Sequence, residues 1–310
     1  MKLWHSLAEV PVDCGESVVT IGKFDGIHLG HRRLIQTAVD LARQISGTAT
    51  LVTFDRHPDA LLHPERAKAP LIGPRQKERL VRNTGVQAML TLPFDSNLAS
   101  AEPADFVRTI LVAALHTRHL VVGEDFRFGR GGAGDIELLQ QLGIAHGFSV
   151  HVVPAVVVGG HRVSSTLVRE ALDSGDVKLA HQLLGRAHAT EGVVEHGRQL
   201  GRQLGYPTAN LARDSEGYLP KDGIYAGWLT CNGQRHPAAL SVGINETVKA
   251  VPRLLEAYVL HRTDLDLYDL EVVVEYVEFI REPAKFGSLE ELVAAIAGDV
   301  LEVEQALQRN

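Results

Sequence analysis

The first half of the chain alternates short apolar runs with segments patterned as helices. Apolar runs of strand length occur at five places: 17–22, 48–54, 86–92, 118–123 and 148–158. Between them, helical spacing or helix start and stop signals occur at 34–45, 74–85, 103–115 and 135–142. Strands that alternate with helices predict a parallel sheet joined by crossover helices.

A different pattern begins after about residue 185. The segment as far as residue 211 is rich in glycine and has no helical period. Strand-like runs separated by turn residues then follow at 223–231, 238–244, 255–261 and 270–280. This pattern predicts an all-β unit, most simply a small barrel.

The chain is predicted to end in a helix. Ser288 is a good N-cap, and Glu291 completes a capping box. One apolar stripe follows, made of Leu289, Leu292, Ile296, Val300, Val303 and Leu307.

Length and composition favour a globular protein of two domains. A chain of 310 residues suits two domains of ordinary size, and we place them at 1–185 and 186–310. The net charge of −7 argues against broad binding to nucleic acid or to an anionic membrane. The two cysteines, Cys14 and Cys231, give no disulfide framework or Cys-rich zinc site. With no signal-peptide core at the N-terminus and no run of about 20 apolar residues, we expect a cytoplasmic protein.

The segment GKFDGIHLGH (22–31) stands where a strand meets the start of a helix. Gly26 and Gly30 allow close approach of the backbone, and a helix N-terminus attracts anions. His28 and His31 could then donate to the same phosphate. Two other interpretations remain open. A zinc site needs further ligands, which no nearby cysteine or histidine supplies at a familiar spacing; the histidines could also be solvated loop residues.

Six segments, in order along the chain, resemble motifs of the bacterial bifunctional riboflavin kinase/FAD synthetases. They are GKFDGIHLGH (22–31), TFDRHP (53–58), VVGEDFRFGRGGAGD (121–135), RVSSTLVRE (162–170), GRQLGYPTANL (201–211) and EAYVLHRTDLDLYDLEVVVEYVEFIRE (256–282). The resemblance covers nearly the whole chain. It implies a Rossmann-like nucleotidyltransferase domain that adenylylates FMN, followed by a six-stranded barrel that phosphorylates riboflavin, with a C-terminal helix. ATP, riboflavin, FMN and FAD are the implied partners.

For the first domain, the resemblance implies catalytic roles for His28, His31 and Arg169. ATP or phosphate binding is implied for Gly22, Phe24, Asp25, Gly26, Ser165 and Thr166, and flavin binding for Asp125, Phe126 and Phe128. The nucleophile, the FMN phosphate, is already an anion, so the work is alignment and charge neutralisation. Ser165 could equally be an ordinary N-cap, and both phenylalanines could be core residues.

For the second domain, the resemblance implies that Glu256 is the base for the riboflavin hydroxyl. Thr208 and Asn210 are implied ligands of Mg²⁺ and ATP, Gly201 a phosphate contact, and Asn245 and Thr247 flavin contacts. Thr208 and Asn210 stand two apart, so an extended strand points both side chains the same way. An exposed strand glutamate and a plain hairpin turn are the alternatives.

Four positions depart from the family pattern. Lys23 stands where the family often has a small apolar residue, and Arg56 replaces the proline of TFDPHP. Glu246 replaces the proline of NPT, and Asp269 the glycine of DLYG. Besides a working bifunctional enzyme, we therefore keep two hypotheses: an adenylyltransferase with a weak or altered kinase, and a non-catalytic flavin- or nucleotide-binding regulator. A metal-dependent hydrolase built on the two histidines is a distant fourth.

Overall fold

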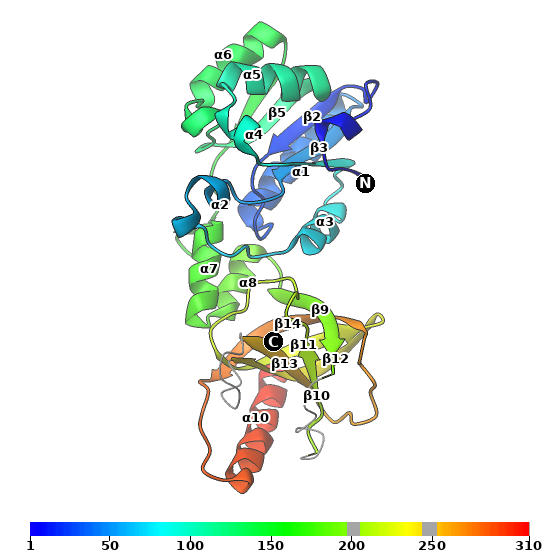
Figure 1. The fold of residues 1–310 in the computed structure, drawn as a ribbon, viewed down its shortest axis with the longest axis vertical. Coiled ribbons are helices and arrows are strands. Elements are labelled where there is room, and N and C mark those ends of the chain that lie inside the picture. Colours follow the sequence, from blue (N-terminus) through cyan, green and yellow to red (C-terminus); the bar gives the residue numbers. More distant parts are fainter. Residues whose placement is uncertain (197–204, 244–252, 310) are drawn as a thin grey trace. The chain divides into compact units, whose positions relative to one another are not determined.

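The computed structural model describes residues 1–196, 205–243 and 253–309 (Figure 1). The chain forms two compact units. The first comprises Met1–Pro70 and Lys77–Ser164, and the second Leu71–Gln76 and Ser165–Asn310. The boundary predicted at residue 185 separates two domains with different activities. That division of activities stays a prediction.

The first unit is built on a six-stranded parallel sheet, as its alternating pattern predicts. The strands are β1 (Lys2–Trp4), β2 (Ser17–Ile21), β3 (Thr48–Phe54), β4 (Ala88–Leu92), β5 (Thr117–Gly123) and β6 (Ser149–Val153), in the spatial order β1-β4-β3-β2-β5-β6. All five residues of β2 are buried, as expected of a central strand covered on both faces.

Helices connect these strands and cover the sheet (Figure 1). They are α1 (Leu29–Gln44), α2 (Pro58–Leu62), α3 (Pro74–Arg82), α4 (Ser96–Ser100), α5 (Pro103–Phe106), which continues as a π-helix over Val107–Ala114, and α6 (Ile136–His146). The helix α1 packs on β2, β3 and β5.

The apolar run 148–158 forms two strands, so its prediction as one strand is wrong. β6 ends at Val153, and β7 (Val157–Val158) turns back to pair with β8 (His161–Arg162). Pro154 separates them, because proline cannot donate a hydrogen bond to a sheet ladder.

The second unit contains a closed antiparallel barrel of six strands, as predicted. The strands are β9 (Ala189–Glu195), β10 (Thr208–Leu211), β11 (Gly223–Cys231), β12 (Gln234–Gly243), β13 (Leu254–Val259) and β14 (Glu271–Arg281), and they close in the order β10-β13-β12-β11-β14-β9. Asn232 and Gly233, both at positive φ, make the two-residue turn between β11 and β12.

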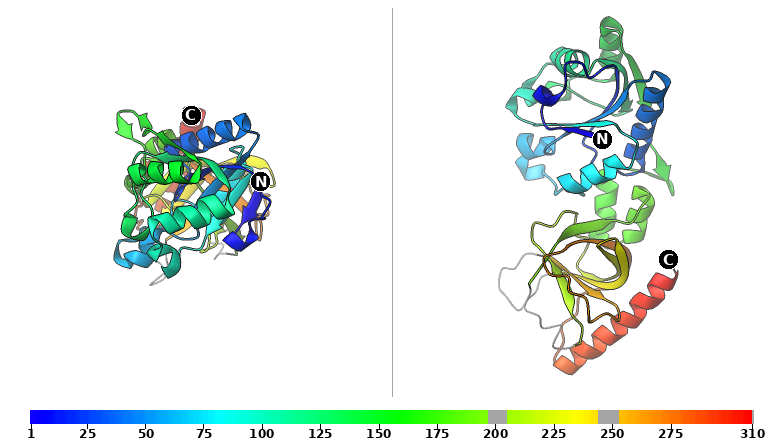
Figure 2. Two further views of the ribbon diagram at one scale, coloured as in Figure 1. Left: turned by 90° about the horizontal axis from the view of Figure 1, so that it is seen from above. Right: turned by 90° about the vertical axis from the view of Figure 1, so that its right-hand side faces the viewer.

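The second unit also contains three helices: α7 (Ser165–Ser174), α8 (Val177–Leu184) and α10 (Leu289–Arg309). Helices α8 and α10 pack on the barrel, and α7 packs on α8. The C-terminal helix α10 lies along the outside of the barrel (Figure 2). Arg281 of β14 holds it by two hydrogen bonds of 2.6 Å to Asp299. Ser288 caps it by accepting from the Glu291 N–H, and the Glu291 carboxylate accepts from the Gly287 N–H.

Candidate active sites

The strand order of the parallel sheet creates a natural ligand crevice. From β2 the chain moves outward to β3 and β4, then crosses back to place β5 on the other side of β2. The carboxyl ends of β2 and β5 therefore lie side by side at a point where the winding direction reverses, which is where open α/β sheets bind ligands. The segment 22–28 leaves β2 at this point, and 124–135 leaves β5.

The turn after β2 has an unusual backbone. Phe24, Gly26 and Ile27 all have positive φ, at 48°, 82° and 43°. Two of the three are not glycine, so the turn stores strain that its surroundings must offset. The Phe24 side chain is fully buried, and the Thr53 hydroxyl donates to the Lys23 carbonyl. These contacts fix the turn before any ligand arrives.

The two histidines lie together at the start of α1. His28 is the N-cap, and its Nδ1 accepts from the His31 N–H at 3.2 Å. The two rings stack with centroids 3.6 Å apart. Since Nδ1 accepts, the proton of a neutral His28 is on Nε2, which makes that atom a donor. Burial, and then the neighbouring His28, hold the pKa of His31 well below its usual value.

Two lysines and a third histidine join this turn. Lys77 Nζ donates to the Lys23 carbonyl at 3.0 Å, and Lys23 Nζ lies 2.8 Å from His57 Nε2. Burial lowers the pKa of both lysines. The sequence analysis assigned no role to Lys77 or His57. The signal was available for His57, because it follows the strand β3, and adjacent parallel strands end at one edge of the sheet.

The loop after β5 carries the three predicted flavin contacts. Phe128 is buried against Phe106 in the main core of the unit, and Phe126 stacks on it at 5.8 Å. Asp125 is exposed and forms an ion pair of 2.8 Å with Arg162. Phe128 therefore has a packing role, and flavin contact by this loop stays a prediction.

The SST motif lies in the second compact unit. Ser165 and Thr166 form the first turn of α7, as predicted. Arg169 is buried, its guanidinium donates to the Ser165 carbonyl at 3.4 Å, and it lies 5.9 Å from the Tyr218 ring centroid. Anion binding by these three residues stays a prediction.

A second site lies on the outer face of the barrel, where β10 pairs with β13. Asn210 stands opposite Glu256, and Thr208 opposite Tyr258. The Thr208 hydroxyl donates to the Glu256 carboxylate at 3.3 Å. Burial raises the pKa of the Glu256 carboxyl, and this hydrogen bond partly offsets the rise. The alternate residues of both strands are buried in the barrel, so the polar residues share the other face.

The donor set at this face suits a hard cation. The Asn210 amide nitrogen donates to the Thr208 carbonyl at 3.4 Å, which leaves its amide oxygen as the atom that could coordinate. Hydroxyl, amide and carboxylate oxygens are the ligands that Mg²⁺ accepts, together with waters and phosphates. Within the described ranges, no group of three or more His, Cys, Asp or Glu side chains could hold a metal.

Four residues of the predicted kinase site, Gly201, Asn245, Glu246 and Thr247, lie outside the described residues.

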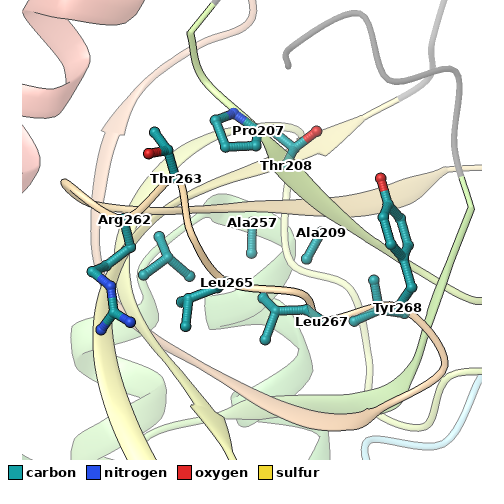
Figure 3. A pocket seen from close by; sticks show the side chains of 11 residues that line it. Pro207, Thr208, Ala209, Ala257, Arg262, Thr263, Leu265, Leu267 and Tyr268 are labelled. Atoms are coloured by element: carbon teal, nitrogen blue, oxygen red, sulfur yellow. The ribbon is translucent and has the colours of Figure 1, made fainter.

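A pocket opens beside Thr208 (Figure 3). Its wall is mainly apolar, and its polar members are Thr208, Arg262, Thr263 and Tyr268. The apolar wall comes from Val194, Pro207, Ala209, Ala257, Val259, Leu265 and Leu267. An apolar cleft with a few polar groups at its rim suits a flat ring system that carries polar atoms.

Together, these features define a class of protein. One unit has a strained turn with two histidines at a sheet crevice. The other has a carboxylate beside a hydroxyl and an amide group, and an apolar pocket. The chain is a two-unit phosphate-transferring enzyme.

Comparison with known proteins specifies this class. Residues 11–167 match the family model of FAD synthetase, and residues 184–307 that of riboflavin kinase. The bifunctional riboflavin kinase/FMN adenylyltransferase of Escherichia coli (strain K12) is 37% identical over 298 residues, which cover 96% of this chain and 94% of that protein. The counterpart from Pseudomonas fluorescens is 39% identical over 97% of this chain and 96% of its own length. The chain belongs to the bifunctional riboflavin kinase/FMN adenylyltransferase family.

A solved structure agrees with this fold over both units. It is described as a macrolide-efflux protein from Streptococcus pneumoniae, and it matches with a TM-score of 0.86 and 32% identity over 96% of each chain. Among the described residues of this chain, no helix combines the length and apolarity needed to cross a membrane.

Proposed function

We propose that the two activities of the family are divided between the two kinds of site described above. The chain phosphorylates riboflavin to FMN and adenylylates FMN to FAD, using one ATP in each step. The barrel carries the kinase, and the crevice of the parallel sheet carries the adenylyltransferase. The observation that supports this division best is that Glu256 and His28 lie in different compact units, each with its own partners.

In the kinase step, Glu256 accepts the proton of the riboflavin 5′-hydroxyl as that oxygen attacks the γ-phosphate of ATP. The raised pKa of its carboxyl makes it a better base than an exposed glutamate. Thr208 and Asn210 would hold Mg²⁺, which would neutralise charge on the phosphates. The pocket beside Thr208 takes the adenine ring.

In the adenylyl transfer, an oxygen of the FMN phosphate attacks the α-phosphate of ATP, and pyrophosphate leaves. His28 donates from Nε2 to a phosphate oxygen, and the first turn of α1 adds its unpaired N–H groups. We assign both reactions to the cytoplasm, where ATP and Mg²⁺ are supplied.

The test is a chromatographic time course with riboflavin, ATP and Mg²⁺. The wild-type protein should form FMN, which then gives way to FAD. Glu256→Ala should abolish FMN formation and leave the conversion of added FMN to FAD near wild type, and His28→Ala should do the reverse. Loss of both activities in either folded variant would contradict the two-site proposal.

The same assay distinguishes the weaker-kinase alternative. If the wild-type protein left riboflavin unchanged but converted added FMN to FAD, the kinase half would have lost or changed its substrate. The departure at Glu246 would then be the first position to revert to proline.

A further inference from the structure

Lys23 carries the inference, because its side-chain amine contacts His57 at the strained turn after β2. It is the second residue after β2, directly before the strained Phe24, and its side chain is exposed. Its Nζ lies 2.8 Å from His57 Nε2, so the ammonium is held at the turn instead of extending freely into solvent.

His57 is itself held on its other side. It is the N-cap of α2, and its Nδ1 lies 3.1 Å from the Asp59 N–H and 3.4 Å from the Asp59 carboxylate. Since Nδ1 accepts from the Asp59 N–H, the proton of a neutral His57 is on Nε2, where it faces Lys23 Nζ. Nζ can accept that proton only as an uncharged amine, so the contact with His57 favours the uncharged form of Lys23, as burial does.

We propose that Lys23 is a substrate-positioning residue of the adenylyltransferase, which is held at the turn by His57 and binds a phosphate oxygen of FMN or ATP as an ammonium. This inference rests on the proposed adenylyl transfer at the turn. When a phosphate binds, Nζ exchanges its contact with His57 for the stronger charge-assisted hydrogen bond to a phosphate oxygen.

The surroundings of Lys23 support a role in binding an anion. Burial lowers the pKa of the Lys23 ammonium, while Asp59 and then Asp25 raise it. Lys77 donates to the Lys23 main-chain carbonyl, so a second ammonium lies at the same turn. A multiply charged phosphate bound at this turn would interact favourably with both ammonium groups.

The first experiment measures steady-state kinetics of FMN-to-FAD conversion at varied FMN and varied ATP. Lys23→Met should lower kcat/KM about tenfold or more, since a hydrogen bond to a charged group is lost. The change should appear mainly in the KM of whichever substrate Lys23 binds, and Lys23→Arg should restore most of it. Lys2→Met, at an exposed position of β1, is the matched control and should match the wild type.

The second experiment uses pH to test the support that Asp59 gives to the Lys23 ammonium. Because Asp59 supports the ammonium, Asp59→Asn should lower the pKa of Lys23, and the alkaline limb of kcat/KM should move to lower pH. In Lys23→Arg this limb should disappear, because arginine stays protonated. Riboflavin phosphorylation should not change in any of these variants.

The outcomes separate the inference from the function beneath it. If the wild-type protein makes FAD and Lys23→Met does so with the same KM for both substrates, the inference is wrong and the function stands. If the wild-type protein makes no FAD from FMN, the proposed adenylyltransferase function is wrong, and the role of Lys23 is wrong with it. If Lys23→Met lowers the melting temperature, the pH profile of Asp59→Asn decides, and an unmoved alkaline limb would overturn the inference.

Discussion

At the scale of single residues, Glu256 is under two opposing influences. Burial favours its protonated form, and the Thr208 hydroxyl favours the carboxylate. The carboxylate is the form that can act as a base, so the proposed role of Thr208 is twofold: it would be a ligand, and it favours the charged form of its neighbour.

Thr208→Val should therefore change the pH dependence of the kinase. Without the hydroxyl, the pKa of the Glu256 carboxyl rises, and the acid limb of kcat/KM for riboflavin moves to higher pH. Activity at the optimum should also fall, by up to about tenfold for the lost hydrogen bond alone. Thr208→Ser, which keeps the hydroxyl, should leave the limb in place. An identical acid limb in the valine variant would mean that the hydroxyl does not act on Glu256.

The residue roles divide into those that the sequence predicted and those that needed the fold. Thr208, Asn210 and Glu256 were predicted from motifs, but their contact depends on the pairing of β10 with β13, across more than forty residues of chain. The contact of Lys23 with His57 depends in the same way on β3 lying next to β2. Short sequence motifs indicate which chemical groups are present, and the strand order determines which of these groups come into contact.

At the scale of elements, the prediction worked where the pattern was strong and local. Strands β2 to β6 of the parallel sheet were predicted from their apolar runs, whereas β1 was missed, because it has three residues and begins with the exposed Lys2. The helix α8 was missed although Asp176 caps its start and Gly185 its end, so those signals were present. The π-helical continuation of α5 could not be predicted, since its residues read as an ordinary helix.

The start of α1 shows how an element constrains its site. A Cβ on Gly30 would lie 3.1 Å from Cε1 and 3.2 Å from Nδ1 of the His28 ring. That is closer than ordinary van der Waals contact, so the observed position of the His28 ring requires glycine at position 30.

Gly30→Ala should therefore displace the His28 ring and weaken its bond to the His31 N–H. FMN-to-FAD conversion should fall about tenfold or more, because a small misplacement of a catalytic group is costly, while riboflavin phosphorylation is unchanged. Gly298→Ala is the control. No atom lies within 4 Å of the added methyl, and the variant should stabilise α10 by about 1 kcal/mol. Full adenylyltransferase activity in Gly30→Ala would show that the ring can move without loss.

At the scale of the whole molecule, acid sensitivity is built into the second unit. His188 is buried between strands and helices, stacks on Tyr276, and its Nε2 lies 2.6 Å from the Tyr218 carbonyl. Burial lowers its pKa to about 4. The unfolded chain, with a histidine pKa near 6.5, binds the proton more readily than the folded unit does.

His188 should accordingly contribute about 3 kcal/mol to the free energy of unfolding. This contribution should be fully present above about pH 6.5 and should be lost as the pH falls toward 4. Urea unfolding measures this, followed by tryptophan fluorescence in a Trp4→Phe background, where Trp228 in the barrel is the remaining tryptophan. His188→Gln should be less stable at pH 7 and show a shallower decline. His181→Gln, at an exposed position of α8, should follow the wild type. Parallel pH curves for all three proteins would rule out His188 as the cause.

The pairing of β10 with β13 also determines where insertions and deletions are compatible with kinase activity. Residues added at the turn of Asn232 and Gly233 lengthen a loop and leave the ladder unchanged. A one-residue slip of β13 would turn Glu256 into the barrel and Ala257 outward. Because a closed barrel has no free edge to absorb the slip, neighbouring ladders would have to shift with it. Insertions and deletions fixed over evolution should therefore collect in the hairpin turns of this barrel and be excluded from β13.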